Sequence, residues 1–219
     1  MRTHSRTVFL VLMLLAALGT SSCILGEEGS GNVITESREV SGFNEIVLGG
    51  SGRVVVEVTG TESLTIEAED NIMPFLETRV SSGSLRLDTN RSISPTVEIV
   101  YTITAATLDG LVISGSGNVE AEAVDGIDFR TDISGSGNVA VAGTLSGLLS
   151  VSISGSGEFD GQSLTSPEGR VEVSGSGNAV VNVTDSLVVD LSGSGDVEFL
   201  GSPSVDSDVS GSGSVTQRD

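Results

Sequence analysis

Carboxylates are the most abundant residues of this chain that could do chemistry. The sequence has 30 Asp and Glu residues, no lysine, and one histidine, His4, near the N-terminus. General acid–base catalysis would therefore fall to Asp, Glu, Tyr101 or Arg. Pairs such as Glu120 with Glu122, and Asp206 with Asp208, have the i, i+2 spacing that places two side chains on one face of a strand. The same spacing is typical of a solvated strand surface, and we assign no catalytic residue and no cofactor.

Calcium binding is the second kind of chemistry that the sequence could indicate. Residues 193–199, Gly-Ser-Gly-Asp-Val-Glu-Phe, are superficially similar to the glycine- and aspartate-rich repeats of calcium-binding β-rolls. Such sites need a hard oxygen ligand that recurs in every coil. Here the corresponding residue varies along the chain: Asn118, Asn138, Glu158, Asn178, Asp196 and Ser214. We expect no specific metal site, and at most loose condensation of cations on an acidic surface.

The N-terminus has the layout of an export signal. Arg2, His4 and Arg6 precede an apolar run over residues 8–18, which is followed by small residues. A transmembrane helix needs roughly 20 apolar residues, so this run is too short to span a bilayer core. We therefore predict a signal peptide over residues 1–22.

Cys23, the only cysteine, stands where a signal peptidase would cut. Its context resembles the lipobox of bacterial lipoproteins, in which the cysteine becomes the lipid-modified first residue of the mature chain. Ser21 and Ser22 fit that pattern, whereas Thr20 departs from the usual leucine. A lone cysteine in an exported protein otherwise lacks a disulfide partner. We predict lipidation of Cys23 and a flexible tether over residues 23–32; the alternative is a plain secretory signal with an incidental cysteine.

The charge balance excludes one class of partner. The formal net charge is −20, and all ten basic residues are arginine. Such a surface repels the phosphates of nucleic acids and anionic headgroups, so we expect no nucleic-acid partner. Residues 23–219 are enough for one domain with a substantial core.

A repeat must position the carboxylates. Ser-Gly-Ser-Gly occurs six times, at intervals of 20, 20, 20, 18 and 18 residues, starting at Ser114, Ser134, Ser154, Ser174, Ser192 and Ser210. Each unit holds two short runs in which apolar and polar residues alternate, the pattern of strands with one buried face. In the first unit, Val119, Ala121 and Ala123 and then Ile127, Phe129, Thr131 and Ile133 have the inward phase. Stacking such units favours an all-β fold, a parallel β-helix with 18–20-residue coils.

The repeated glycines are expected to form one corner of every coil. A sharp bend that recurs at the strand spacing brings backbones together and favours positive φ, and both demands suit glycine. The polar residue after each motif should form a ladder along this edge. We assign twelve structural corner residues: Gly115, Gly117, Gly135, Gly137, Gly155, Gly157, Gly175, Gly177, Gly193, Gly195, Gly211 and Gly213.

Residues 33–110 are also rich in strand patterns but less periodic. Gly50-Ser51-Gly52 resembles an early copy of the corner, and the 65 residues from Gly50 to Gly115 would hold about three coils. We predict irregular, wider coils here, continuous with the regular coils of residues 111–219 in one domain. A separate antiparallel sandwich is the alternative.

The mature chain resembles the head GIN domain family, described as adhesin head domains of bacterial envelopes. The resemblance rests on residues 38–46, on residues 71–80 followed by Gly83-Ser84-Leu85, and on the serial Ser-Gly-Ser-Gly-Asn corners. It implies a right-handed β-helix on an exported or lipid-anchored protein. It carries no catalytic positions to this chain.

We therefore expect a non-catalytic lipoprotein of the cell envelope, at the outer membrane or cell surface, that presents a rigid acidic β-helix for adhesion or ligand binding. Its partners would be the membrane, through the anchor, and a glycan or protein surface. The open ends of a solenoid also favour association between copies, although Asp208, Arg218 and Asp219 could blunt this end and keep a monomer. Two other functions stay open: a carbohydrate-active enzyme that uses carboxylates, and a regulatory or sensory envelope module.

The anchor gives the first testable prediction. Cys23→Ser removes the only thiol that could be lipidated, so the variant should move from the membrane fraction to the soluble fraction after cell lysis. Fractionation with immunodetection measures the change, with Ser22→Ala as the matched control. Membrane retention of the cysteine variant would refute the lipid tether.

Overall fold

The computed structural model describes residues 26–218. The predicted signal peptide and Cys23 lie outside the described residues. No helix within the described range has the length and apolar character needed to cross a membrane.

Strands dominate the described chain, with one short 3-10 turn, η1 (Met73–Phe75). The strands are β1 (Glu27–Glu28), β2 (Val33–Arg38), β3 (Glu45–Leu48), β4 (Arg53–Val58), β5 (Ser63–Glu69), β6 (Leu76–Ser81), β7 (Ser84–Thr89), β8 (Ile93–Ser94), β9 (Val100–Ala105), β10 (Gly110–Ile113), β11 (Asn118–Gly126), β12 (Phe129–Ile133), β13 (Asn138–Leu145), β14 (Leu148–Ile153), β15 (Glu158–Val173), β16 (Asn178–Leu191), β17 (Val197–Leu200), β18 (Ser204–Val209) and β19 (Val215–Gln217).

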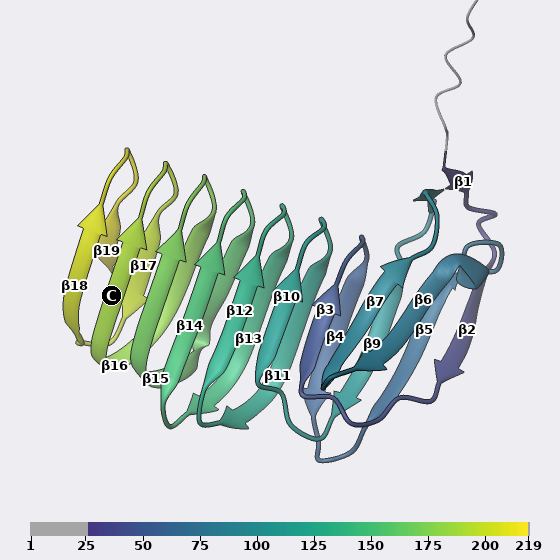
Figure 1. Cartoon of the computed structure of the whole chain (residues 1–219), viewed down its shortest axis with the longest axis horizontal. Helices are drawn as coiled ribbons and strands as arrows, with labels where there is room; N and C mark the ends of the chain where they lie inside the picture. The colour runs from purple at the N-terminus through teal and green to yellow at the C-terminus, as the bar shows by residue number, and fades with distance from the viewer. Residues whose placement is uncertain (1–25, 219) are drawn as a thin grey trace, which may run out of the picture.

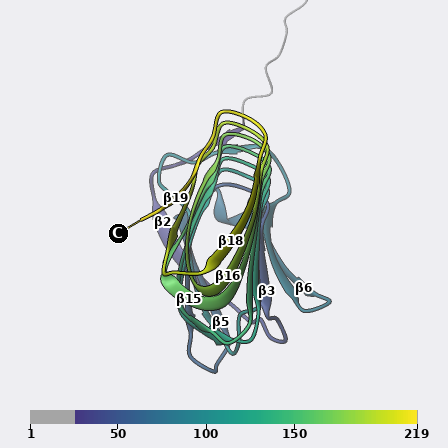
Figure 2. The same cartoon turned by 90° about the vertical axis from the view of Figure 1, so that its left-hand side faces the viewer.

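From β10 onward the chain forms a parallel β-helix, as the repeat predicts. Each Ser-Gly-Ser-Gly corner joins a strand of one broad face to a strand of the other, and every coil pairs in parallel with the next (Figure 1). The register follows the repeat: Val119 lies opposite Val139, and Val139 lies opposite Phe159. Viewed along the stack, the coils superpose as a narrow, flattened ring (Figure 2).

A thin apolar core fills this ring. Phe129 and Phe159 are 1% and 0% exposed, as their inward phase predicts. Ala123 and Ile127 were predicted to point inward but are exposed, Ile127 by 71%. A bulge after Ala121 accounts for Ala123, which has a φ of 59°, because the pairing with β13 resumes only at Val124. Ile127 faces solvent for a different reason: it lies in the turn between β11 and β12.

The corner glycines are held by contact with the coil before them. A Cβ on Gly135 would overlap the carbonyl oxygen of Gly115, and the same holds from each corner to the next. Of the twelve assigned glycines only Gly211 has positive φ, so the predicted left-handed conformation is wrong for the other eleven. Their need for glycine comes from the close approach of stacked backbones.

The corner at residues 49–52 lies directly against the corner at residues 114–117. Ser114 N–H donates to the Leu48 carbonyl at 3.1 Å, and Asn118 N–H donates to the Gly52 carbonyl at 2.9 Å. The prediction of three coils between these corners is therefore wrong. The intervening chain is placed on the other side of the early corner, because β7 and β9 pair in parallel with β3 and β4.

Antiparallel strands close this end of the stack. β5 pairs antiparallel with β2 and β9, and β6 pairs antiparallel with β7. These strands belong to the same 17-stranded sheet as the coils, so there is no separate sandwich. At the other end, β18 is exposed along its whole length, and Val205 and Val209 are each 41% exposed because no described coil covers them.

Residues 27–32, which we call the lead, are bonded to the rest of the domain, so the expectation of a flexible tether is wrong for this stretch. β1 pairs with β8. Asp70 accepts hydrogen bonds from the Ser30 hydroxyl and the Asn32 amide, and Asn71 donates to the Glu28 carbonyl. The lead is thus fixed to the body by both backbone and side-chain bonds.

Glu69 is the buried centre of this attachment. Its side chain is shielded from solvent and accepts hydrogen bonds from the N–H groups of Gly31, Thr96 and Val97 and from the Thr96 hydroxyl. The hydroxyl bond from Thr96, followed by the backbone bonds, lowers the pKa of Glu69 below its ordinary value of 4.5, against the effect of burial. One carboxylate thus joins the lead, the end of β5 and the segment after β8.

The corner contacts predict a matched pair of glycine variants. Gly115→Ala should destabilise the domain by about 3 kcal/mol or more, because its Cβ overlaps the Gly50 carbonyl and neither backbone can retreat without breaking the stack. Gly50→Ala is the control, because the nearest atom to a Cβ there is the Thr89 methyl at 3.9 Å. Urea unfolding measures both free energies, and equal losses would contradict the contact mechanism.

Glu69 predicts an acid-sensitive attachment of the lead. Since its pKa is lower in the folded chain than in the unfolded chain, its stabilisation is complete above the unfolded pKa and is lost as pH falls through the folded pKa. Glu69→Gln should remove this part of the pH dependence and speed amide exchange at residues 29–32 already at neutral pH. Hydrogen exchange followed from pH 7 to pH 3 tests this, with the exposed Glu67→Gln as control. An unchanged pH profile in the Glu69 variant would contradict the assignment.

Candidate functional site

The solenoid offers two broad faces to a partner. We call front face the outward residues of β3, β10, β12 and β14 and of the strands that pair with β14 in succession, namely the second part of β15, the second part of β16, and β18. The back face comprises the outward residues of β4, β11 and β13, the first parts of β15 and β16, and β17 and β19. Parallel register fixes the position of each outward side chain relative to those of the neighbouring coils.

The front face carries charge pairs within single strands. Arg130 binds Asp132 through Nε at 2.7 Å and through its second amino group at 2.9 Å, and Arg170 binds Glu172 in a similar way. These bonds to Asp132 raise the pKa of Arg130 further. Ser150 and Ser152 lie between the two pairs, on β14. The arginines are thus partly neutralised by their own strands, and exposed pairs of this kind add little stability.

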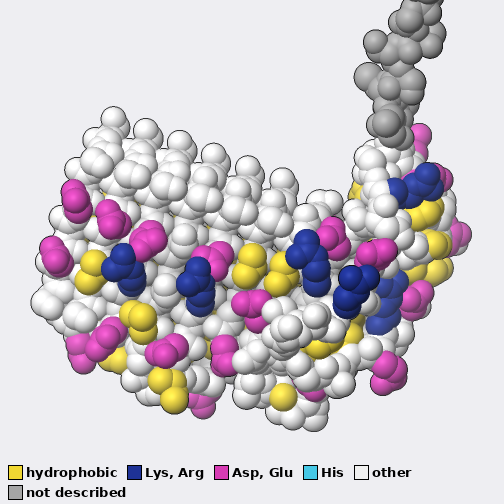
Figure 3. All heavy atoms as spheres, in the orientation of Figure 1, with side chains coloured by type: hydrophobic (Ala, Val, Ile, Leu, Met, Phe, Trp, Pro, Cys, Tyr) yellow, Lys and Arg dark blue, Asp and Glu magenta, His cyan; other side chains and the backbone are white. Residues whose placement is uncertain are grey.

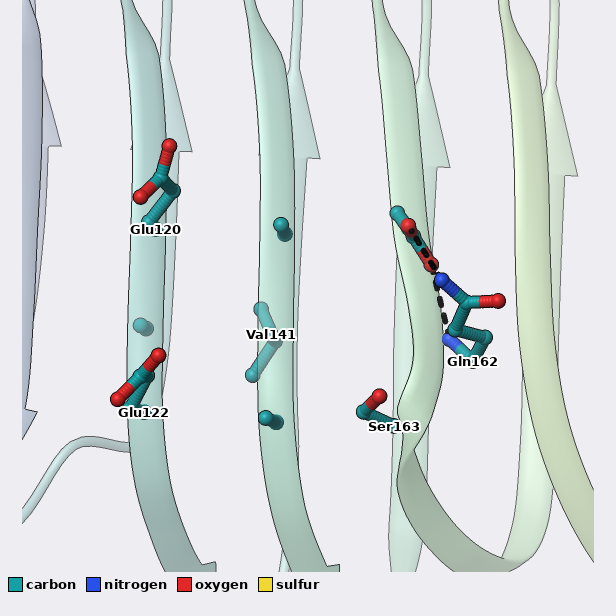
Figure 4. Close-up of a pocket in the computed structure, with 9 residues that line it drawn as sticks. Glu120, Glu122, Val141, Gln162 and Ser163 are labelled. Carbon is teal, nitrogen blue, oxygen red and sulfur yellow. Dashed lines mark hydrogen bonds between the residues drawn. The ribbon is translucent and has the colours of Figure 1, made fainter.

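The back face contains a shallow trough across three coils (Figure 4). Glu120, Ala140 and Asp160 are neighbours in register on β11, β13 and β15. Because alanine is short, the middle strand forms the floor, and carboxylates from the flanking strands rise on both sides. The volume is about 210 Å³, and the lining also includes Glu122 and Gln162.

Hydrogen bonds orient the polar groups of the trough. Arg53 on β4 binds Glu120 at 2.7 Å and holds it from one side. Gln162 donates to Asp160 through its side-chain amide and through its backbone N–H, both at 3.1 Å. Glu122 points along the same outward row, as its spacing from Glu120 predicts (Figure 4). The trough therefore presents two oriented acceptors, Glu120 and Asp160, beside the outward Glu122, and this arrangement suits hydroxyl and amide donors.

The predicted polar ladder lies between this trough and the corners. Asn138 donates to Asn118 at 3.1 Å, the Asp196 N–H donates to Asn178 at 2.9 Å, and Ser214 donates to Asp196. Glu158 interrupts the series, since within residues 26–218 its side chain makes no hydrogen bond to its neighbours in register, Asn138 and Asn178. Corner residues and trough residues thus belong to one continuous, ordered surface.

The candidate acid–base groups of the described chain differ in their access to solvent. Tyr101 is 1% exposed within the core, and burial raises its pKa to about 12, so it is unsuited to proton transfer near neutral pH. Over residues 26–218 no three His, Cys, Asp or Glu side chains converge as metal ligands. In the trough, Glu120 and Glu122 are exposed to solvent, and Asp160 is half-buried.

The sequence predicted that Glu120 and Glu122 lie on a solvent-exposed strand face, but it did not predict the trough that they line. Its signal was available in the aligned repeats, where small Ala140 and Ala142 follow the two glutamates and precede Asp160 and Gln162. Glu69 was also missed, because it lies outside the periodic units and its partners are remote in the sequence.

Comparison with known proteins places the fold. A protein of Bacteroides fragilis described as a "putative adhesin" superposes with a TM-score of 0.69 at 23% identity, over 88% of this chain and 100% of its own. A "putative lipid binding protein" and a "putative adhesin" of Parabacteroides distasonis reach TM-scores of 0.56 and 0.53 at 22% and 20% identity; each match covers 88% of this chain, and 99% and 100% of the respective relative. No curated protein matches the chain.

A family profile settles the membership. It matches residues 42–203, which include the early corner, strands β5 and β6 of the antiparallel end and five of the six Ser-Gly-Ser-Gly corners. The family is described as "Putative auto-transporter adhesin, head GIN domain". The chain belongs to this head GIN domain family.

Proposed function

We propose that this protein is a non-catalytic, lipid-anchored protein of the cell envelope whose solenoid presents the back face for adhesion. The observation that carries the proposal is the trough, in which oriented acceptors lie on a rigid, register-fixed surface. Rigid side chains lose little conformational freedom when a ligand binds, so even shallow contacts can contribute to affinity.

The chemistry of the trough favours an uncharged or basic ligand rich in hydrogen-bond donors. Glu120, Glu122 and Asp160 accept hydrogen bonds, whereas an acidic ligand would be repelled by them and by a net charge of −20. Neutral glycans and basic or amide-rich protein surfaces meet these demands. Repetition of such a ligand along a polymer would add avidity to weak single contacts.

Family membership supports an exported, adhesin-like role, and the predicted signal and Cys23 supply the route to the envelope. One structural relative is described as a lipid binding protein. In this chain the ring of each coil is filled by buried apolar side chains, so we propose contact with lipid through the anchor and the outer surface.

Variants of the trough test this function. The triple variant Glu120→Gln, Glu122→Gln and Asp160→Asn keeps shape and removes charge, and we expect at least tenfold weaker binding to those neutral glycans or cell surfaces that the native protein binds. The front-face variant Glu172→Gln, Asp190→Asn and Asp208→Asn removes the same number of charges; it is the control and should change binding less than twofold. The mature Cys23→Ser protein, screened on a glycan array and on whole cells, provides the measurement.

Two outcomes would count against the proposal. Equal losses in both variants would show that net charge, and not the trough, carries binding. Glycan turnover that disappears when one carboxylate is neutralised would replace adhesion with catalysis.

A further inference from the structure

The edge of the solenoid that carries the corners differs in chemistry from the rest of the surface. We call it the serine edge; it comprises residues 49–52, 114–117, 134–137, 154–157, 174–177, 192–195 and 210–213. These segments contain only glycine and serine, and their serines are exposed. Figure 3 shows this edge free of charged side chains along the regular coils, whereas carboxylates are scattered below it.

The N-terminal lead joins the body at this same edge. Residues 90–99 connect β7 to β9 and occupy the place of a corner, since the Leu87 and Ile99 carbonyls accept hydrogen bonds from the Gly49 and Arg53 N–H groups at the two ends of the neighbouring corner. β1 pairs with β8 inside that segment. In Figure 1, β1 accordingly lies on the side of the corners.

The stretch between Cys23 and the lead is short. From Cys23 to Gly26 the chain spans three peptide units, or about 10 Å at full extension. Residues 28–32 are bonded to Glu69, Asp70 and Asn71, so this distance cannot grow without breaking the attachment. A lipid on Cys23 would therefore hold the corner side of the N-terminal end within about 10 Å of the headgroups.

The distribution of exposed carboxylates then favours one orientation of the domain on the bilayer. The opposite edge, formed by the turns between the back-face and front-face strands, exposes Asp125, Asp128, Glu168 and Asp185. An anionic bilayer repels that edge, whereas the serine edge offers hydroxyl donors to phosphate oxygens and no carboxylate. The edge is also straight, with seven corners about 4.8 Å apart, so it can lie along a bilayer over about 29 Å.

We propose that the serine edge is a membrane-facing surface, which rests against phospholipid headgroups and holds the solenoid axis parallel to the bilayer. This proposal depends on the lipid anchor of the proposed function. In this orientation both broad faces stand perpendicular to the membrane, and the trough is reached from the side.

Glycine amides at the two edges provide built-in reporters for the test. The mature lipidated protein is placed on nanodiscs of phosphatidylcholine and phosphatidylglycerol that contain a gadolinium-chelating lipid, and paramagnetic relaxation of the amide resonances is measured. We expect strong enhancement at Gly115, Gly135 and Gly175 on the serine edge and at least fivefold weaker enhancement at Gly126 and Gly147 on the opposite edge.

A charge variant sharpens the result. Ser136→Glu with Ser176→Glu places two carboxylates on the serine edge, and enhancement at the corner glycines should fall at least twofold. Thr144→Glu with Ser202→Glu adds the same charge at exposed positions of the opposite edge and should leave the pattern unchanged.

The outcomes separate this inference from the anchor itself. A protein that co-floats with the nanodiscs but shows equal enhancement at both edges, or a steady decrease from Gly50 to Gly213 as in an upright solenoid, overturns the orientation and leaves the anchor standing. A protein that fails to co-float overturns both.

Discussion

Contact between glycine backbones of successive corners is the constraint on which the rest of the structure depends. Each corner amide bonds to the coil before it, as Ser136 N–H does to the Gly115 carbonyl at 3.1 Å, and the approach leaves no room for a Cβ on Gly135. A bulkier corner would force coils apart at one edge only and break the ladders on both faces. Close packing at the corners therefore sets the spacing for the core and for every outward side chain.

This regularity has a direct consequence for function. In a solenoid each coil contacts its neighbours alone, so the outer surface can vary from coil to coil while the backbone path is preserved. The back face uses this freedom: alanine on β13 lies between acidic neighbours on β11 and β15, and the trough forms where bulges after Ala121 and Ala140 interrupt the regular pairing of these strands. Membership in an adhesin-like family fits a scaffold that separates surface chemistry from stability.

The closed end has a different role from the repeats. Parallel coils expose an unpaired edge, and antiparallel strands β2, β5 and β6 cover it at the end where the lead arrives. The same end gathers the hydrogen bonds of Glu69, Asp70 and Asn71, which fix residues 28–32 to the body. Covering the edge and fixing the lead are thus achieved by one group of strands, so the direction in which the chain leaves the domain is part of the fold.

The sequence by itself determined the fold class, the coil length, the phase of most buried residues and the position of the corners. It could do so because these properties repeat, and because alternation and glycine spacing are local signals. Only the tertiary structure decided three other features: the stacking of the corner at residues 49–52 directly on that at residues 114–117, the bulge that turns Ala123 outward, and the burial of Glu69. Each of these depends on contacts between residues far apart in the chain, for which no periodic pattern exists to be read.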